Sequence, residues 1–135
     1  MLKSTRTLLA VGATRLDAFD RLKRELGKIS NAQALFIAMA WGFKHGTRSM
    51  DMKRSNTGTR LEYLKPHHEA LLTAIHLSEV GDPEALGNIE QRLDLAEQYA
   101  DGGLMLLDKL MDEQGEFRRA FAGEIKLFAS EFTRE

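Results

Sequence analysis

Four histidines and several neighbouring carboxylates are the residues of this 135-residue sequence whose types suit metal binding or acid–base chemistry. His68 and His76 share one face of a helix that we expect to begin near Pro66, and Glu69 and Glu79 are close to them in sequence. Eight residues of helix span more than about 10 Å, so the two imidazoles cannot meet at one ion without a ligand from elsewhere. We therefore expect these histidines at the surface or its boundary, and no bound metal.

Other signatures of catalysis are missing from the sequence. The chain has no cysteine, no Gly-rich phosphate loop after a strand and no GxSxG elbow. Neighbouring carboxylates such as Asp112 with Glu113, and Glu97 with Asp101, fall on predicted helix faces that we expect to point to water. We predict that the protein is not an enzyme and that it needs no cofactor.

The residues that best suit a binding function are the cations in the segment from 44 to 65. This segment holds six Lys and Arg residues against only Asp51 and Glu62. Clustered cations bind nucleic-acid backbones by releasing counterions, although a charge run is often only a solubility feature. No aromatic residue lies between Arg48 and Arg60 to stack on single-stranded bases, so the duplex backbone is favoured. The predicted nucleic-acid-binding residues are Lys44, Arg48, Lys53, Arg54, Arg60 and Lys65.

Charge is divided unevenly along the chain. Residues 1–68 hold 13 Lys and Arg against 5 Asp and Glu, and residues 69–135 hold 6 against 15, although the net charge of the whole chain is only −1. Such a division favours an anionic partner for the basic half, or head-to-tail contact between copies. The alternative is that the basic half and the acidic half pack against each other.

Length and composition are those of one globular domain, which we expect to cover residues 1–135. Hydrophobic residues make up 43% of the chain and charged residues 29%, unlike a disordered sequence. The absence of cysteine favours a reducing compartment. The most apolar run, 34–43, is about half of the roughly 20 residues that a spanning helix needs, and the first residues lack a signal-peptide pattern. We expect a cytoplasmic protein without a membrane segment.

The elements that must position these residues are predicted to be helices. Apolar spacing predicts one helix from 14 to 26, with Thr14 as its cap and Gly27 at its end, and another from Pro66 to Gly81. Between them, AQALFIAMAWGFKHG is apolar almost all the way round, which is typical of a buried central helix. Residues 47–66 are polar and without periodicity, so we expect a long loop there.

The acidic half is also predicted to be helical. A helix is expected to end at Asp101-Gly102-Gly103, and another to run from 104 to 113. The last predicted helix carries an aromatic seam that either covers the core or docks on another copy of the protein. Because such an apolar seam needs a partner surface, we predict a homo-oligomer whose interface contains Phe117, Phe121, Ile125, Phe128 and Phe132.

Together these elements predict an all-α fold. We expect a compact bundle of five or six helices. A short N-terminal extended arm, or an edge strand, is predicted at KSTRTLLAV.

Three stretches carry a family resemblance: ALFIAMAWGFKHGTR, LLTAIHLSEVGDPEAL and EQYADGGLMLLDKL. Their most distinctive pieces are Gly42-Phe43 with Gly46 and Arg48, the GDP at 81–83, and the segment 99–103. Over about residues 29–110 the chain resembles a small protein family associated with bacterial Dnd systems. These systems modify DNA by phosphorothioation and couple that mark to restriction of foreign DNA. The resemblance implies a place in such a system and supplies no catalytic residues.

Residues 5–46 are also similar, more faintly, to the ribbon-helix-helix plan, in which the extended arms of a dimer lie in the DNA major groove. RLKRELG, followed by a turn and an apolar helix, looks comparable to the E protein of Dnd systems, a nicked-DNA-binding oligomer. This second resemblance implies DNA contact by an oligomer.

From the charge and the resemblance we predict a non-catalytic DNA-binding accessory protein of a DNA-modification-linked or anti-phage defence system. The alternative is an adaptor without nucleic-acid affinity that recruits a larger defence ATPase or nuclease. A third hypothesis is a transcriptional regulator of ribbon-helix-helix type. The expected partners are the duplex DNA backbone, further copies of the chain and a larger protein of the system.

Overall fold

Four α-helices and a two-stranded antiparallel sheet make up the part of the chain that the computed structural model describes, residues 6–82, 84 and 87–113. The predicted all-α bundle of five or six helices is therefore wrong. A sheet is present, and two of the predicted helices are one. In chain order the elements are β1 (Leu8–Gly12), α1 (Leu16–Glu25), α2 (Asn31–Lys44), β2 (Arg54–Arg60), the 3-10 helix η1 (Leu61–Tyr63), α3 (Pro66–Val80) and α4 (Ile89–Asp112).

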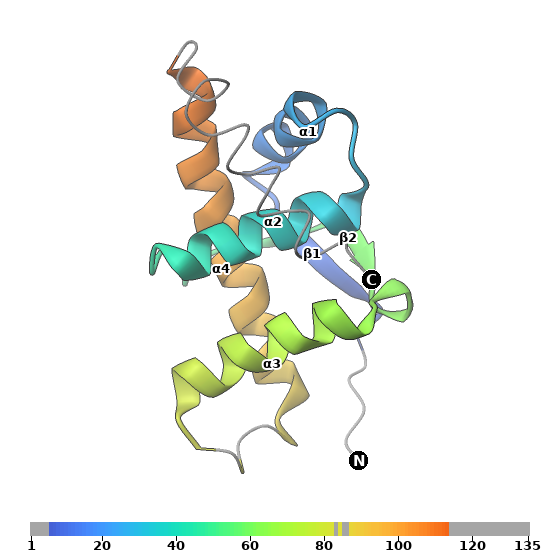
Figure 1. The fold of residues 1–135 in the computed structure, drawn as a ribbon, viewed down its shortest axis with the longest axis vertical. Helices are drawn as coiled ribbons and strands as arrows, with labels where there is room; N and C mark the ends of the chain where they lie inside the picture. The colour runs from blue at the N-terminus through green and yellow to red at the C-terminus, as the bar shows by residue number, and fades with distance from the viewer. Residues whose placement is uncertain (1–5, 83, 85–86, 114–135) are drawn as a thin grey trace.

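Helix α2 is the centre of the core, with α4 crossing it and with α1 and α3 on either side (Figure 1). Its residues 34–42 are all buried, as predicted for a helix that is apolar on every face. A capping box begins this helix: the Ser30 Oγ accepts the Gln33 N–H, and the Gln33 Oε1 accepts the Ser30 N–H. These two reciprocal hydrogen bonds define the first turn of α2.

Helix α4 continues without a break through Gly102 and Gly103, where the sequence pattern predicted a helix end. Both glycines are buried beside α2 and the segment that follows it. A Cβ on Gly103 would overlap the backbone carbonyl of Ala38, and a Cβ on Gly102 would overlap that of Thr47. These glycines let two backbones approach closely, and they do not end the helix. The predicted helix 104–113 is therefore the second half of α4.

The polar segment that was expected to be a loop contains β2, which pairs with β1. Leu8 lies opposite Arg60, and Ala10 lies opposite Gly58. The sequence RSNTGTR of β2 has no apolar residue, so no alternating pattern marks it as a strand. Gly58 is required by the pairing, because a Cβ there would overlap the Leu9 carbonyl. The predicted N-terminal arm, in contrast, is β1.

Helices α1 and α3 end at glycines that the sequence predicts, whereas the predicted cap of α1 is absent. Helix α3 ends at Gly81, which has a φ of 67°, and α1 is followed by Gly27 and Lys28, with φ of 88° and 61°. At the start of α1, Arg15 is the N-cap and no side chain caps the helix, so the predicted cap by Thr14 is wrong. Within the described ranges, no helix is long and apolar enough to cross a membrane.

We expect Gly103→Ala to destabilise the protein by about 1–3 kcal/mol, the usual cost of overpacking a filled core. The sign of the change in the free energy of unfolding distinguishes a tight crossing from an open one, because alanine replacing glycine inside an exposed helix stabilises by up to about 1 kcal/mol. Gly87→Ala is the matched control, since a Cβ at that position would meet no heavy atom of the described residues within 4 Å. Urea unfolding followed by circular dichroism compares the two variants. An unchanged midpoint for Gly103→Ala would mean that the crossing of α2 and α4 has room for a methyl group.

Candidate nucleic-acid interface

Arg54, one of the predicted DNA-binding residues, lies at the start of β2, where its side chain is 41% exposed and contacts a buried carboxylate. Its Nε donates to both carboxylate oxygens of Glu97, at 2.9 and 3.1 Å. Glu97 is on α4 and is only 2% exposed. Its Oε2 also accepts the backbone N–H of Ala10, at 2.7 Å. One buried carboxylate therefore joins α4 to both strands of the sheet.

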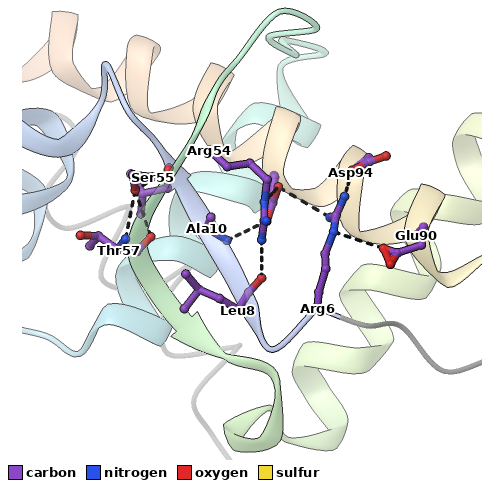
Figure 2. A network of polar contacts seen from close by, with 10 residues as sticks. Arg6, Leu8, Ala10, Arg54, Ser55, Thr57, Glu90 and Asp94 are labelled. Carbon is purple, nitrogen blue, oxygen red and sulfur yellow. Dashed lines mark hydrogen bonds and ion pairs between the residues drawn. The ribbon is translucent and has the colours of Figure 1, made fainter.

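The same network covers the edge of β1 that is remote from β2 (Figure 2). On this edge, Glu97 accepts the Ala10 N–H and the Arg54 guanidinium donates to the Leu8 carbonyl, at 2.7 Å. An unpaired strand edge is a template for association with another strand. The contacts of Arg54 thus cover this edge of the sheet. The positive charge of Arg54, which the sequence pattern assigned to DNA, is paired with Glu97.

Arg6 extends this network to Glu90 and Asp94 (Figure 2). It forms ion pairs with Glu90 at 3.2 Å, with Glu97 at 3.7 Å and with Asp94. Burial by itself lowers the pKa of Arg6, but the hydrogen bond to Asp94 and the charges of the three carboxylates raise it above its ordinary value. The segment before β1 is in this way bound to the first half of α4.

Asp101, one helical turn after Glu97, is also buried and is 3% exposed. Its Oδ2 lies 3.2 Å from the Nε of Arg15, at the start of α1. A Cβ on Gly12 would overlap the Asp101 Oδ1, so the carboxylate lies directly against the end of β1. The expectation that Glu97 and Asp101 face water is wrong, because each has an arginine from the basic half as its partner.

The opposite charges of the two halves are therefore partly paired with each other inside the protein. Packing of the two halves against each other, the alternative named for this pattern, accounts for many of the cations. The arginines of the basic half that form ion pairs with carboxylates of α3 or α4 are Arg6, Arg15, Arg21, Arg48 and Arg54.

Arg48 is held between α3 and α4. Its guanidinium lies 5.9 Å from the centre of the Tyr99 ring, and its Nη1 lies 3.6 Å from Glu79 Oε1. The Tyr99 hydroxyl donates to the same Glu79 oxygen. Burial, followed by this hydrogen bond, raises the pKa of Tyr99 to about 12. Like Arg54, Arg48 has partners inside the protein.

The remaining four predicted cations lie in different places. Lys44 ends α2 and Lys53 precedes β2, and both are exposed. Arg60 and Lys65 come together at Tyr63: the Arg60 guanidinium lies 6.0 Å from the Tyr63 ring, and Tyr63 and Lys65 line one cavity of about 290 Å³. We call this the Lys65 cavity; its lining includes Ser30, Gln33, Tyr63, Lys65, His67 and His68.

The Lys65 cavity lies at the first turn of α2, whereas Lys44 lies in the last turn. A helix of 14 residues is about 20 Å long, so these two lysines cannot share one small patch. The structure therefore brings together Arg60 and Lys65 and does not gather all six predicted cations on one surface.

Three cations that the sequence pattern did not single out lie near the start of α2. They are on α1 and in the turn after it, and they line a depression of about 280 Å³ that also includes Ile29. Ile29 directly precedes Ser30 of the Lys65 cavity, so the depression and the cavity adjoin at the start of α2. We call the cations around this point the basic surface: Lys23, Arg24, Lys28, Arg60 and Lys65.

Two of the histidines are buried, contrary to the expectation for them. His76 is fully buried, and it joins α3 to α4: its Nε2 lies 2.8 Å from Gln91 Oε1, and the Arg92 Nε donates to its Nδ1 at 3.3 Å. His68 is 6% exposed. In the described part of the chain, no three His, Asp or Glu side chains are grouped so that they could hold a metal ion.

The predicted oligomer interface, Phe117, Phe121, Ile125, Phe128 and Phe132, lies outside the described residues. Homo-oligomerisation therefore stays a prediction, as does a single domain over residues 1–135.

Comparison with known protein families places the chain in a described family. Residues 20–129 match the family described as DNA sulphur modification system-associated protein 4. The matched range includes α2, β2, α3 and α4 and every residue of the basic surface. No curated protein and no solved structure matches the chain.

Arg54→Ala should lower the free energy of unfolding by about 1–3 kcal/mol, because the buried Glu97 carboxylate loses its closest cation and the Leu8 carbonyl loses its donor. Arg60→Ala is the matched control, since it removes the same charge from an ion pair with Glu62 in which both side chains are exposed. The control should change stability by less than about 0.5 kcal/mol. Equal losses for the two variants in chemical denaturation would contradict a structural role for Arg54.

Tyr99 should make the free energy of unfolding depend on pH between the ordinary pKa of tyrosine, 10.0, and its raised pKa of about 12. Its folded-state pKa, about 12, is above the model-peptide value of 10.0, so its contribution is complete below pH 10 and is lost as the pH rises towards 12. The difference in unfolding free energy between the wild type and Tyr99→Phe should therefore narrow over that range. Denaturant titrations at pH 9, 10 and 11 measure it, and a constant difference would show that Tyr99 ionises normally.

Proposed function

The chain belongs to the family of DNA sulphur modification system-associated protein 4, and from this premise we propose that it is a non-catalytic accessory protein that binds the DNA backbone for that system. The association with DNA sulphur modification follows from the family, and it agrees with the Dnd resemblance of the sequence. The proposal adds DNA contact, the absence of catalysis and the surface involved.

The basic surface is the observation that carries the proposal. Its five cations come from α1, from the turn before α2 and from the ends of β2 and the segment before α3. Two of the five cations form ion pairs with carboxylates: Asp20 Oδ1 is 3.7 Å from Lys23 Nζ, and Glu62 Oε1 is 2.6 Å from Arg60 Nε. The excess of positive charge suits phosphates, which lysine and arginine contact irrespective of base sequence.

The buried ionisable groups support the absence of catalysis. Glu97 is committed to Arg54, Asp101 to Arg15, and His76 to Gln91 and Arg92. Each of these contacts joins two elements of the fold, so a change of protonation or position would disturb the core. Groups held in this way are poorly suited to act as a nucleophile or a general base.

The adaptor hypothesis also has an observation in its favour. A groove of about 470 Å³, lined by Trp41, Leu106 and Leu110 among others, lies at the last turn of α2. An apolar groove of this size suits side chains of a protein partner, such as a larger protein of the same system. The ribbon-helix-helix hypothesis loses its basis, because β1 pairs with β2 of the same chain and its other edge is covered by Glu97 and Arg54.

An electrophoretic shift of duplex DNA tests the proposal. The wild type should bind at about 50 mM salt, and log affinity should fall against log salt with a slope of roughly −4, from about −0.9 for each of about five phosphates. The double variant Arg24→Gln with Lys28→Gln should make the slope shallower by about two. Lys44→Gln with Lys109→Gln, an equal loss of charge at the other end of α2, should leave it unchanged.

Failure of the wild type to shift duplex DNA at this salt concentration would contradict the DNA proposal, and the adaptor hypothesis would then lead. Equal effects of the two double variants would mean that net charge, and not the basic surface, governs binding.

A further inference from the structure

Six of the seven residues that line the Lys65 cavity have a side-chain group that can donate a hydrogen bond, and one of these six is a lysine. Lys65 supplies an ammonium group, Tyr63 a hydroxyl, and His67 and His68 imidazoles. Among the described residues, no carboxylate lines it. Its volume of about 290 Å³ lies at the lower end of the range for small-ligand sites, so it suits a small group.

The capping box leaves donors facing the first turn of α2. The Ser30 Oγ and the Gln33 Oε1 are both used as acceptors of backbone N–H groups. Within the part of the chain that the structure describes, the hydroxyl proton of Ser30 and the amide N–H groups of Gln33 remain for an acceptor from outside. The first backbone N–H groups of α2 have no acceptor within the helix, as at any helix start.

The histidine wall of the cavity is held in place by packing. His68 Nδ1 accepts the Lys65 N–H at 3.0 Å, and the His68 ring lies 4.4 Å from the Phe36 ring, centre to centre. His67 packs on His68 with the ring centres 4.1 Å apart. The Nε2 of His67 is shielded from solvent and, within the described residues, has no hydrogen-bond partner. A buried nitrogen without a partner on the lining of a cavity indicates a missing water or ligand.

We propose that the Lys65 cavity is a binding site for a single phosphate group, which in the DNA complex is a phosphate of the duplex backbone. Lysine binds phosphate as a point charge, and the starts of α2 and α3, which meet at this cavity, both favour an anion. Binding of phosphate by the Lys65 cavity does not depend on the proposed function. Its assignment to the DNA backbone rests on that function.

Gln33→Glu is the sharpest variant for testing the site. Glutamate at this position preserves the capping box, so α2 keeps its start, but it replaces amide donors by a negative charge. Asn56→Asp is the matched control, because it makes the same chemical change at an exposed position of β2 that does not line the cavity. Circular dichroism and thermal melting establish that both variants fold.

Two measurements on the full chain decide the proposal. In ¹H–¹⁵N NMR spectra, inorganic phosphate should shift the Gln33 and His67 amide signals saturably in the wild type and in Asn56→Asp. In Gln33→Glu it should bind at least about tenfold more weakly, because the new carboxylate repels the anion. In duplex binding, Gln33→Glu should make the salt slope shallower by about one, as expected for the loss of one phosphate contact.

The outcomes separate the site from the proposed function. Phosphate binding that is sensitive to Gln33→Glu, with duplex binding unchanged, would keep a site for free phosphate and overturn its assignment to DNA. Duplex binding that leaves the cavity signals unmoved, together with no response to phosphate, would overturn the site while the proposed function stands. A cavity that responds to neither probe in a protein that does not bind duplex would overturn both.

Discussion

Helices α2 and α4 cross so closely that glycine is required on both of them, and the remaining elements are arranged around this crossing. A Cβ on Gly42 would overlap the Tyr99 carbonyl, and a Cβ on Gly103 would overlap the Ala38 carbonyl. The close approach places the first half of α4 beside the sheet and leaves the start of α2 next to β2, where the Asn31 side chain donates to the Gly58 carbonyl at 3.0 Å. The position of α2 therefore determines where the Lys65 cavity lies.

The buried carboxylates of α4 decide which cations remain for a ligand. A buried charge must be paired, because the cost of removing it from water is otherwise several kcal/mol. Glu97 and Asp101 meet this requirement with Arg54 and Arg15, which come from the basic half of the chain. A count of Lys and Arg along the sequence thus overestimates the charge available to DNA. Two of the cations around the start of α2, Arg60 and Lys23, form ion pairs with the exposed carboxylates Glu62 and Asp20.

The basic surface is built from short-range and long-range features together. A turn of two residues with positive φ, Gly27 and Lys28, reverses the chain after α1 and brings its last cations next to the start of α2. The segment η1 then brings Tyr63 and Lys65 to the same place from the other direction. The capping box of α2 lies between them, so one local motif serves both to begin the central helix and to present donors. A phosphate bound there would be contacted by elements that are distant in sequence.

Local patterns were sufficient to predict α2, the end of α3 and the family. Apolar periodicity, caps and motif residues are all contained in short stretches of sequence. They were insufficient for β2, for the continuity of α4 and for the partners of the arginines. The strand RSNTGTR exists because β1 offers it hydrogen bonds, and Gly102 and Gly103 stay helical because another backbone lies against them. Whether Arg54 meets DNA or Glu97 likewise depends on a residue 43 positions away. Types of side chain and helix boundaries are local properties, whereas burial, pairing of charges and the meeting of two helix starts are decided only when the chain has folded.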